Sequence, residues 1–152
     1  MKRRIFFPGS FNPFTAGHAD ILRRLLALAD FVTVGIGMNI DKPGSSELAD
    51  ANARAILDFI VDSGLTARVD VIVYSGLTGQ KAKDLGASCI ARGVRSATDF
   101  DYEYSMAAVN RSAFGVETIF LPADPQLGMV SSTVVRDLLS HGRNDIAKRF
   151  MP

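Results

Sequence analysis

The chain contains a single cysteine, Cys89, so it cannot form a disulfide within itself. A lone thiol in an apolar stretch is typical of a small core residue in a reducing compartment. Long apolar runs are also missing, because the stretch from Leu25 to Met38 is interrupted by Asp30 and cannot cross a bilayer. The apolar residues that follow the basic N-terminus stop at Pro8, far short of a signal peptide. We therefore expect a cytoplasmic protein with no membrane partner.

An excess of positive charge is missing as well. The formal net charge is +1, and the only basic run is Lys2-Arg3-Arg4. A long nucleic acid has no matching surface here, so we expect no nucleic-acid partner, whereas small anionic ligands are compatible with this balance. The 152 residues, of which 47% are hydrophobic, are enough for one domain with its own core. We expect that domain to span residues 1–152.

Short runs rich in β-branched and aromatic residues alternate with longer segments of helical periodicity. Strands are expected at Arg3–Phe7, Phe31–Met38, Arg68–Tyr74, Ser88–Arg92 and Glu117–Leu121. Helices are expected at Gly17–Leu28, Ser46–Ser63 with a serine cap, Gln80–Leu85, Thr98–Asn110 and Thr133–Leu139. This order predicts a Rossmann-like α/β fold, a five-stranded parallel sheet with helices on both faces. Ligands of such sheets bind beyond the carboxyl ends of the strands.

The loop after the first expected strand carries groups that suit a phosphate ligand. Gly9 and Gly17 allow close approach of the backbone, and Ser10 offers a hydroxyl. His18 falls in the first turn of a helix, where free N–H groups and the helix dipole favour an anion. A turn that merely starts a helix, with an incidental histidine, explains the same residues, so the loop alone leaves both interpretations open.

Two further loops offer donors. Arg92 and Arg95 flank a glycine at the end of the fourth strand and can present guanidinium groups to phosphate, or pair with acidic residues of the next helix. Ser131, Ser132 and Thr133 precede the last helix as a cluster of hydroxyls, which suits either a triphosphate or a simple helix cap.

In the helix between these two loops, Phe100, Tyr104 and Ala107 have helical spacing. This spacing predicts that they face the core.

Three segments resemble the phosphopantetheine adenylyltransferase family. They are P-G-S-F-N-P-F-T-A-G-H at residues 8–18, R-G-V-R-S-A-T-D-F-D-Y-E at 92–103, and V-S-S-T at 130–133. The second segment matches the family pattern R-G-x-R-x-x-x-D-[FY]-x-Y-E over all twelve positions. Asn12 and Gly76 stand where the family usually has aspartate, and Leu127 where an aromatic residue is common.

The resemblance implies a reaction: the adenylyl group of ATP passes to 4′-phosphopantetheine by direct in-line attack, giving dephospho-coenzyme A and pyrophosphate. It also implies Mg²⁺, coenzyme A as a feedback ligand and a homohexamer. No cluster of carboxylates suggests a metal site in the chain itself.

The same resemblance assigns roles to residues. The implied catalytic residues are His18, Lys42 and Arg92, and the implied substrate-binding residues are Ser10, Lys42, Thr78 and Arg92. The implied ATP-binding residues are Ser10, Phe11, His18, Gly93, Val94, Arg95, Glu103, Leu127, Gly128, Met129, Val130, Ser131, Ser132 and Thr133. Without the resemblance, Lys42 would be interpreted as an exposed surface lysine.

Three alternatives remain. A sister nucleotidyltransferase acting on nicotinamide mononucleotide or glycerophosphate would more often show H-x-G-H, where this chain has Thr15. A class I aminoacyl-tRNA synthetase would need more than 152 residues and a K-M-S-K-S segment. A non-catalytic nucleotide sensor would not need three cations at one centre. The enzyme interpretation therefore requires His18, Lys42 and Arg92 to surround one pocket.

Overall fold

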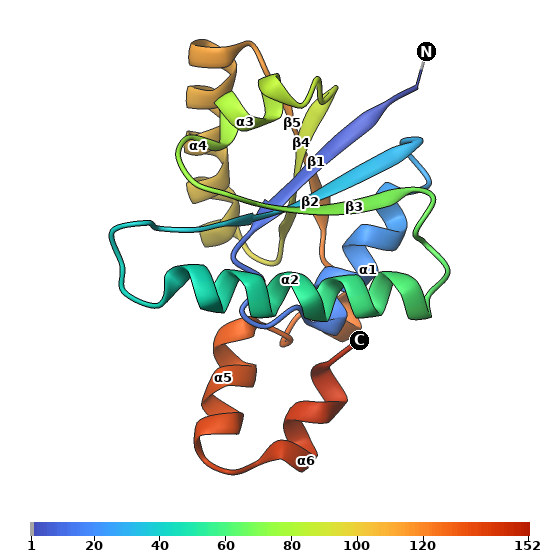
Figure 1. Ribbon diagram of the computed structural model, residues 1–152, viewed down its shortest axis with the longest axis vertical. Coiled ribbons are helices and arrows are strands. Elements are labelled where there is room, and N and C mark those ends of the chain that lie inside the picture. The colour runs from blue at the N-terminus through green and yellow to red at the C-terminus, as the bar shows by residue number, and fades with distance from the viewer. Residues whose placement is uncertain (1) are drawn as a thin grey trace.

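A computed structural model describes residues 2–152. Its centre is a sheet of five parallel strands in the order β3-β2-β1-β4-β5, which confirms the predicted fold class (Figure 1). The strands are β1 (Arg4–Gly9), β2 (Phe31–Gly37), β3 (Val69–Tyr74), β4 (Cys89–Val94) and β5 (Thr118–Pro122). The chain adds strands on one side of β1 and then crosses to the other, so the strand order reverses between β1 and β4. Ligand sites form at such a reversal.

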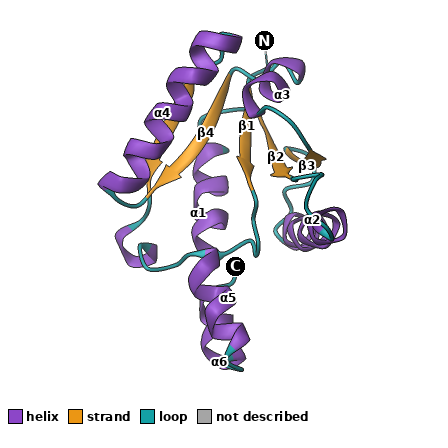
Figure 2. Ribbon diagram, turned by 90° about the vertical axis from the view of Figure 1, so that its left-hand side faces the viewer, coloured by secondary structure: helices purple, strands orange, loops and turns teal. Residues whose placement is uncertain are grey.

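Helices cover both faces of the sheet. They are α1 (Ala16–Leu25), α2 (Ser45–Asp62), α3 (Thr78–Asp84), α4 (Ala97–Phe114), α5 (Ser132–Ser140) and α6 (Asn144–Ala147). The helices α1 and α2 pack on one face, and α3 and α4 on the other. Figures 1 and 2 show α5 and α6 projecting beyond the carboxyl ends of the strands. The helices α5 and α6 therefore lie next to the edge of the sheet at which ligands of this fold bind.

The sheet separates two cores because successive side chains of a strand point to opposite faces. In β1, Ile5 and Phe7 join the larger core under α1 and α2, whereas Phe6 joins the smaller core with Tyr74 and Ala82. All three β1 side chains are at most 3% exposed. This double burial fixes β1 as the central strand.

Local structure differs from the sequence-based prediction at several points. The start of α2 has no serine cap: Gly44 holds the cap position with a positive φ of 77°, and the Ser45 hydroxyl donates to the Asn39 carbonyl instead. The helix α4 ends at Phe114, with Gly115 as its C-cap, about a full turn later than predicted. The short helix α6 was not predicted.

The core prediction for α4 is wrong at two positions. Phe100 is 42% exposed and Tyr104 is 61% exposed, while Asn110 is the only buried residue of the helix. The helix covers β4 and β5 at the edge of the sheet, so its outer side has no layer above it among residues 2–152. None of the helices in that range combines the length and apolar character that a membrane span requires.

Candidate active site

A cavity of about 350 Å³ lies at the carboxyl ends of β1 and β4, where the strand order reverses. We call it the main cavity. It is bounded by the loop of residues 10–15, the end of β4 with the start of α4, and the start of α5. Its size lies within the range of small-molecule sites. The fold therefore brings the three candidate loops to one place.

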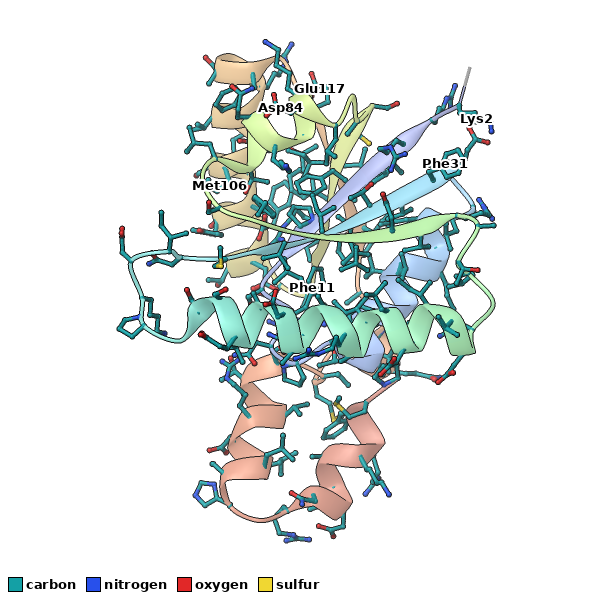
Figure 3. The ribbon with its side chains drawn as sticks, viewed as in Figure 1. Lys2, Phe11, Phe31, Asp84, Met106 and Glu117 are labelled. Carbon is teal, nitrogen blue, oxygen red and sulfur yellow. The ribbon has the colours of Figure 1, made fainter. Side chains whose placement is uncertain are left out.

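The loop of residues 10–15, here the first loop, is held by a buried aromatic ring. Phe11 is 2% exposed and has a positive φ of 47°, a conformation that costs free energy in residues other than glycine. Its ring packs edge to face on Phe7, 5.2 Å between centroids, and a side chain at Gly9 would lie 3.0 Å from it. Gly9 thus leaves space for the Phe11 ring, which holds the loop in place. Figure 3 shows Phe11 at the opposite end of the sheet from Phe31.

His18 is tied into the start of α1 by a capping box. The Thr15 hydroxyl accepts from the His18 N–H, and the Thr15 N–H donates to His18 Nδ1 at 3.0 Å. Because Nδ1 accepts a hydrogen bond, the proton of the neutral imidazole is assigned to Nε2. Burial, followed by the charges of Arg92 and Arg95, lowers the pKa of His18 from 6.5 to about 4. The side chain is therefore a neutral donor at pH 7.

Arg92 is paired inside the cavity. Its Nε and Nη2 donate to the two carboxylate oxygens of Glu103, both at 2.8 Å, and its Nη1 donates to the Pro8 carbonyl. The Glu103 side chain is only 12% exposed. The ion pair therefore lies inside the cavity and not on a solvent-exposed helix face. A guanidinium has five N–H donors, and two of those on Arg92 have no partner among residues 2–152. They can meet an oxyanion without breaking the pair.

Arg95 and the start of α5 close the other side. Arg95 donates to the Asp99 carboxylate at 3.3 Å and reaches the Val130 carbonyl at 3.5 Å. Ser131 caps α5 through Val134 N–H, so the cap interpretation holds for this one hydroxyl. Ser132 donates to the Pro13 carbonyl at 2.7 Å and so ties α5 to the first loop. The positive end of the α5 dipole therefore faces the cavity.

Arg136 lines the main cavity but was not predicted. Its Nη1 donates to the Asn12 carbonyl at 2.6 Å and its Nη2 to the Thr133 hydroxyl at 3.2 Å. The signal was present in the sequence, because Arg136 follows Thr133 by three residues and so lies on the same helix face. It adds a third guanidinium to those of Arg92 and Arg95.

A second cavity of about 170 Å³ lies next to the first, and we call it the side cavity. Both cavities are lined by Pro8, Gly9, Arg92 and Glu103. The far wall of the side cavity comes from β3, α3, α4 and β5, with Tyr74, Thr78, Met106, Asn110 and Thr118. The Arg92–Glu103 pair therefore stands at the junction of two compartments.

Comparison with known proteins gives the family. A family model described as cytidylyltransferase-like matches residues 6–138. The phosphopantetheine adenylyltransferase of Porphyromonas gingivalis is 41% identical over 161 aligned residues, which cover 100% of this chain and 96% of that protein. The one from Bacteroides fragilis is 39% identical over 150 residues, covering 99% and 96%. The chain belongs to the phosphopantetheine adenylyltransferase family.

A solved structure supports the fold of this family member. TmcAL of Thermotoga maritima, bound with α-thio ATP, matches with a TM-score of 0.67 at 11% identity. The match covers 99% of this chain and 53% of that protein, so the chain spans about half of its length. At this identity the likeness concerns the fold alone.

Most residues that the family resemblance singled out lie in the two cavities. The main cavity is lined by Ser10, Phe11, His18, Arg92, Gly93, Arg95, Glu103, Leu127, Val130, Ser131, Ser132 and Thr133. Thr78 lies in the side cavity. Val94, Gly128 and Met129 line neither cavity. The predicted loops therefore converge, although not every position within them faces the space.

Lys42 is apart from the other predicted catalytic residues. It lies in the exposed connection between β2 and α2 and lines neither cavity, whereas His18 and Arg92 share the main cavity. Its backbone N–H donates to the Asn39 carbonyl, and its own carbonyl accepts from Ser45. The structure therefore brings two of the three predicted catalytic residues together and leaves the third on a surface loop.

Proposed function

We propose that this chain transfers the adenylyl group of ATP to 4′-phosphopantetheine, releasing pyrophosphate and dephospho-coenzyme A. One observation carries the proposal: His18, Arg92, Arg95 and the start of α5 line one cavity at the switch point of a parallel sheet. Relatives that carry the name of this activity match 99% or more of the chain. Residues 1–152 as a single nucleotidyltransferase domain, and a cytoplasmic location, stay predictions.

In the proposed mechanism ATP lies in the main cavity, with its phosphates between the first loop and the start of α5. A phosphate oxygen of the acceptor attacks the α-phosphorus in line, the bond to the bridging oxygen breaks, and pyrophosphate leaves with the electron pair. The acceptor phosphate is already ionised near neutral pH, so no protein nucleophile is needed. Rate acceleration comes from positioning and from stabilising the charge that develops on the α-phosphate.

His18 suits the role of neutral donor in that transition state. Its Nε2–H is the free end of an imidazole whose Nδ1 is held by the Thr15 N–H. Ser10 lines the cavity on the same loop and would align the acceptor phosphate. The two remaining donors of Arg92 stand where the cavities meet, which is where the two phosphates would have to be pressed together.

The side cavity suits the pantetheine arm because its walls mix apolar surface with polar groups. Thr118 lines this cavity, and its hydroxyl is buried without a hydrogen-bond partner among residues 2–152. The Tyr74 and Thr78 hydroxyls are 3.0 Å apart, and burial raises the pKa of Tyr74. Asn110 is 8% exposed on the same wall. These polar groups match an acceptor with amides, and Thr78 keeps its proposed substrate-binding role.

Lys42 keeps its proposed catalytic role only if its loop moves. A lysine is a flexible point charge that could neutralise the reacting phosphates from the solvent side. The connection from residue 38 to residue 44 would have to fold over the mouth of the cavity on substrate binding.

Mg²⁺ is proposed to enter with the nucleotide. Within the described part of the chain, no three histidine, cysteine, aspartate or glutamate side chains lie close enough together to hold a metal ion. Mg²⁺ retains several water molecules and commonly binds through substrate phosphates. When bound there, it would neutralise charge on the triphosphate, while Arg92, Arg95 and Arg136 supply the charge of the protein.

The protein is also proposed to form a homo-oligomer, a hexamer by the family resemblance, with coenzyme A as a feedback ligand of the two cavities. Support for association comes from α4, where Tyr102, Met106 and Val109 share one side by helical spacing and are 66%, 41% and 55% exposed. Contiguous apolar surface of this kind marks interaction sites. Tyr102 and Met106 also line the side cavity, so a subunit packed on α4 would cover the proposed acceptor site.

The decisive experiment measures pyrophosphate release from ATP and Mg²⁺ with a panel of acceptors. Release with 4′-phosphopantetheine, and little with nicotinamide mononucleotide or glycerol 3-phosphate, is the expected result. Release with one of the other acceptors would instead assign the sister activity. ATP binding by calorimetry with no release for any acceptor would assign a nucleotide sensor.

A further inference from the structure

The imidazole of His18 is stacked within a chain of aromatic rings. Phe11 meets it edge on, with ring centroids 4.9 Å apart, and Phe14 lies nearly parallel to it, at 5.6 Å and 21°. The Phe14 ring is in turn backed by Phe59 of α2, 5.4 Å away. Arg23 of α1 lies over the ring of Phe59, 5.2 Å from its centroid. Contacts therefore run from two helices, through the first loop, to His18.

These contacts add a constraint that the hydrogen bonds lack. The bond from the Thr15 N–H fixes one atom of the imidazole, Nδ1, but leaves the ring able to tilt about it. A ring packed flat on one face and edge on at the other loses that freedom. The direction of Nε2–H depends on this tilt, and a donor in catalysis must be aimed to within a fraction of an ångström.

We propose that Phe14, backed by Phe59 of α2, is a positioning residue that fixes the plane of the His18 imidazole and so aims Nε2–H into the main cavity. Phe14 contacts both His18 and Phe59. Because no ring contact joins Phe59 to His18 directly among residues 2–152, Phe59 acts through Phe14. The kinetic consequences rest on the proposed adenylyl transfer. The state of the imidazole itself does not, and it can be measured without substrates.

The charged groups near His18 are largely paired with one another, so burial has the largest influence on the pKa of His18. The charged side chains that line the same cavity are Arg92, Arg95, Asp99, Glu103 and Arg136. Arg92 is neutralised by Glu103, and Arg95 is paired with Asp99. Burial is the largest cause of the low pKa of His18, ahead of both arginines. Opening the stack should therefore change the titration of His18 even when every charge is kept.

The test is a histidine NMR titration of the full chain with Phe14→Leu and Phe59→Leu. Phe59 is only partly buried, so Phe59→Leu should fold even if Phe14→Leu does not. We expect the pKa of His18 to rise from about 4 by about one pH unit or more in Phe14→Leu, and by less in Phe59→Leu. Phe59→Tyr, which keeps the ring, should titrate as the parent does. Adding Phe59→Leu to Phe14→Leu should change nothing further, because coupled residues are not additive.

Turnover gives the second measurement. Both leucine variants should lose turnover, Phe14→Leu by about tenfold. The KM for ATP should change much less, because the direction of the His18 Nε2–H is lost while the contacts that bind ATP remain. Phe31→Leu is the matched control: Phe31 lies at the far end of the sheet, as Figure 3 shows, and contacts Lys2 and Arg4. It should leave the His18 titration and turnover unchanged.

The two measurements separate the possible failures. If Phe14→Leu and Phe59→Leu lower only the thermal stability and leave the His18 titration as in the parent, the rings are merely core and the proposal is wrong. If the parent releases no pyrophosphate yet the titrations shift as expected, the proposed function fails and the positioning of His18 stands. Equal losses in Phe31→Leu and Phe59→Leu would likewise overturn the proposal.

Discussion

At the scale of single residues, the site depends on a histidine that carries no charge. The capping box and the surrounding rings keep the His18 imidazole neutral, so it can act as a donor at pH 7 without a proton being taken up on binding. Positive charge is supplied separately by guanidinium groups, which remain protonated at any pH of interest. In this cavity the neutral His18 supplies a hydrogen-bond donor, whereas the arginines supply the positive charge.

His18→Ala should lower turnover at least about a hundredfold, the usual cost of removing one transition-state donor. The circular dichroism spectrum should be unchanged, because only the side-chain half of one cap is lost. His141→Ala, which alters the other histidine on the exposed end of α5, is the control and should keep full turnover. Near-normal turnover of His18→Ala in the pyrophosphate assay would remove His18 from the mechanism.

The low pKa of His18 also predicts a pH dependence of stability. Between pH 6.5 and about 4 the unfolded chain binds a proton at His18 and the folded chain does not, so acid favours unfolding. Above pH 6.5 both states are neutral there and the effect vanishes. The free energy of unfolding should therefore fall by up to about 3 kcal/mol across this window relative to His18→Gln, which keeps an acceptor for the Thr15 N–H. Urea unfolding at about pH 7, 5.5 and 4 measures the difference. Parallel pH dependences for the two proteins would contradict it.

At the scale of elements, the side cavity depends on how closely α3 approaches α4. Gly79 of α3 is buried, and a side chain there would lie 2.4 Å from Phe114 and 2.6 Å from the Asn110 Oδ1. Asn110 lines the side cavity. The absence of a side chain at one position therefore sets both the packing of two helices and the shape of the proposed acceptor site.

Gly79→Ala should destabilise the fold by about 1–3 kcal/mol, the usual cost of overpacking, and raise the KM for the acceptor more than the KM for ATP. Gln80→Ala, on the exposed side of the same helix, is the matched control and should stay within about 0.5 kcal/mol of the parent. Urea denaturation and steady-state kinetics measure both effects. An unchanged KM for the acceptor in a folded Gly79→Ala protein would argue against the side cavity as its site.

At the scale of the whole molecule, α4 is an outer layer that no other element of residues 2–152 covers. Its side chains include Tyr102 at 66% exposed and Val109 at 55%, although the helix has a sheet beneath it. The same side of the helix lines the side cavity with Tyr102 and Met106. Assembly and acceptor binding are therefore proposed to share one surface.

Val109→Glu should dissociate the proposed oligomer, because a carboxylate placed in an apolar interface loses its hydration. Val109 lines neither cavity, so the variant separates assembly from direct contact with ligands. Val61→Glu introduces the same charge on α2, where Val61 is 62% exposed, and should leave the assembly intact. Light scattering after size exclusion measures both masses. A parent that is already monomeric would contradict the proposed assembly.

The sequence by itself determined the order of the elements, the parallel sheet and the loops that meet at its carboxyl edge. These follow from local patterns: period-two and helical apolar spacing, glycines at turns, and hydroxyls before a helix. The succession of elements does not by itself locate the switch point, because it is compatible with more than one strand order. In the structure Ser10, His18, Arg92 and Thr133 all line the main cavity there. The chemistry of each loop can be predicted because it depends on residues that are neighbours in the sequence.

Only the tertiary structure decided how these groups are paired. Arg92 bonds the Pro8 carbonyl across 84 positions of sequence and Arg136 bonds Asn12 across 124, distances at which no local pattern gives information. The exposure of Phe100 and the position of Lys42 outside both cavities depend likewise on which layers the fold places beside them. Periodicity tells which face of a helix is apolar, but whether anything covers that face is a property of the packed chain.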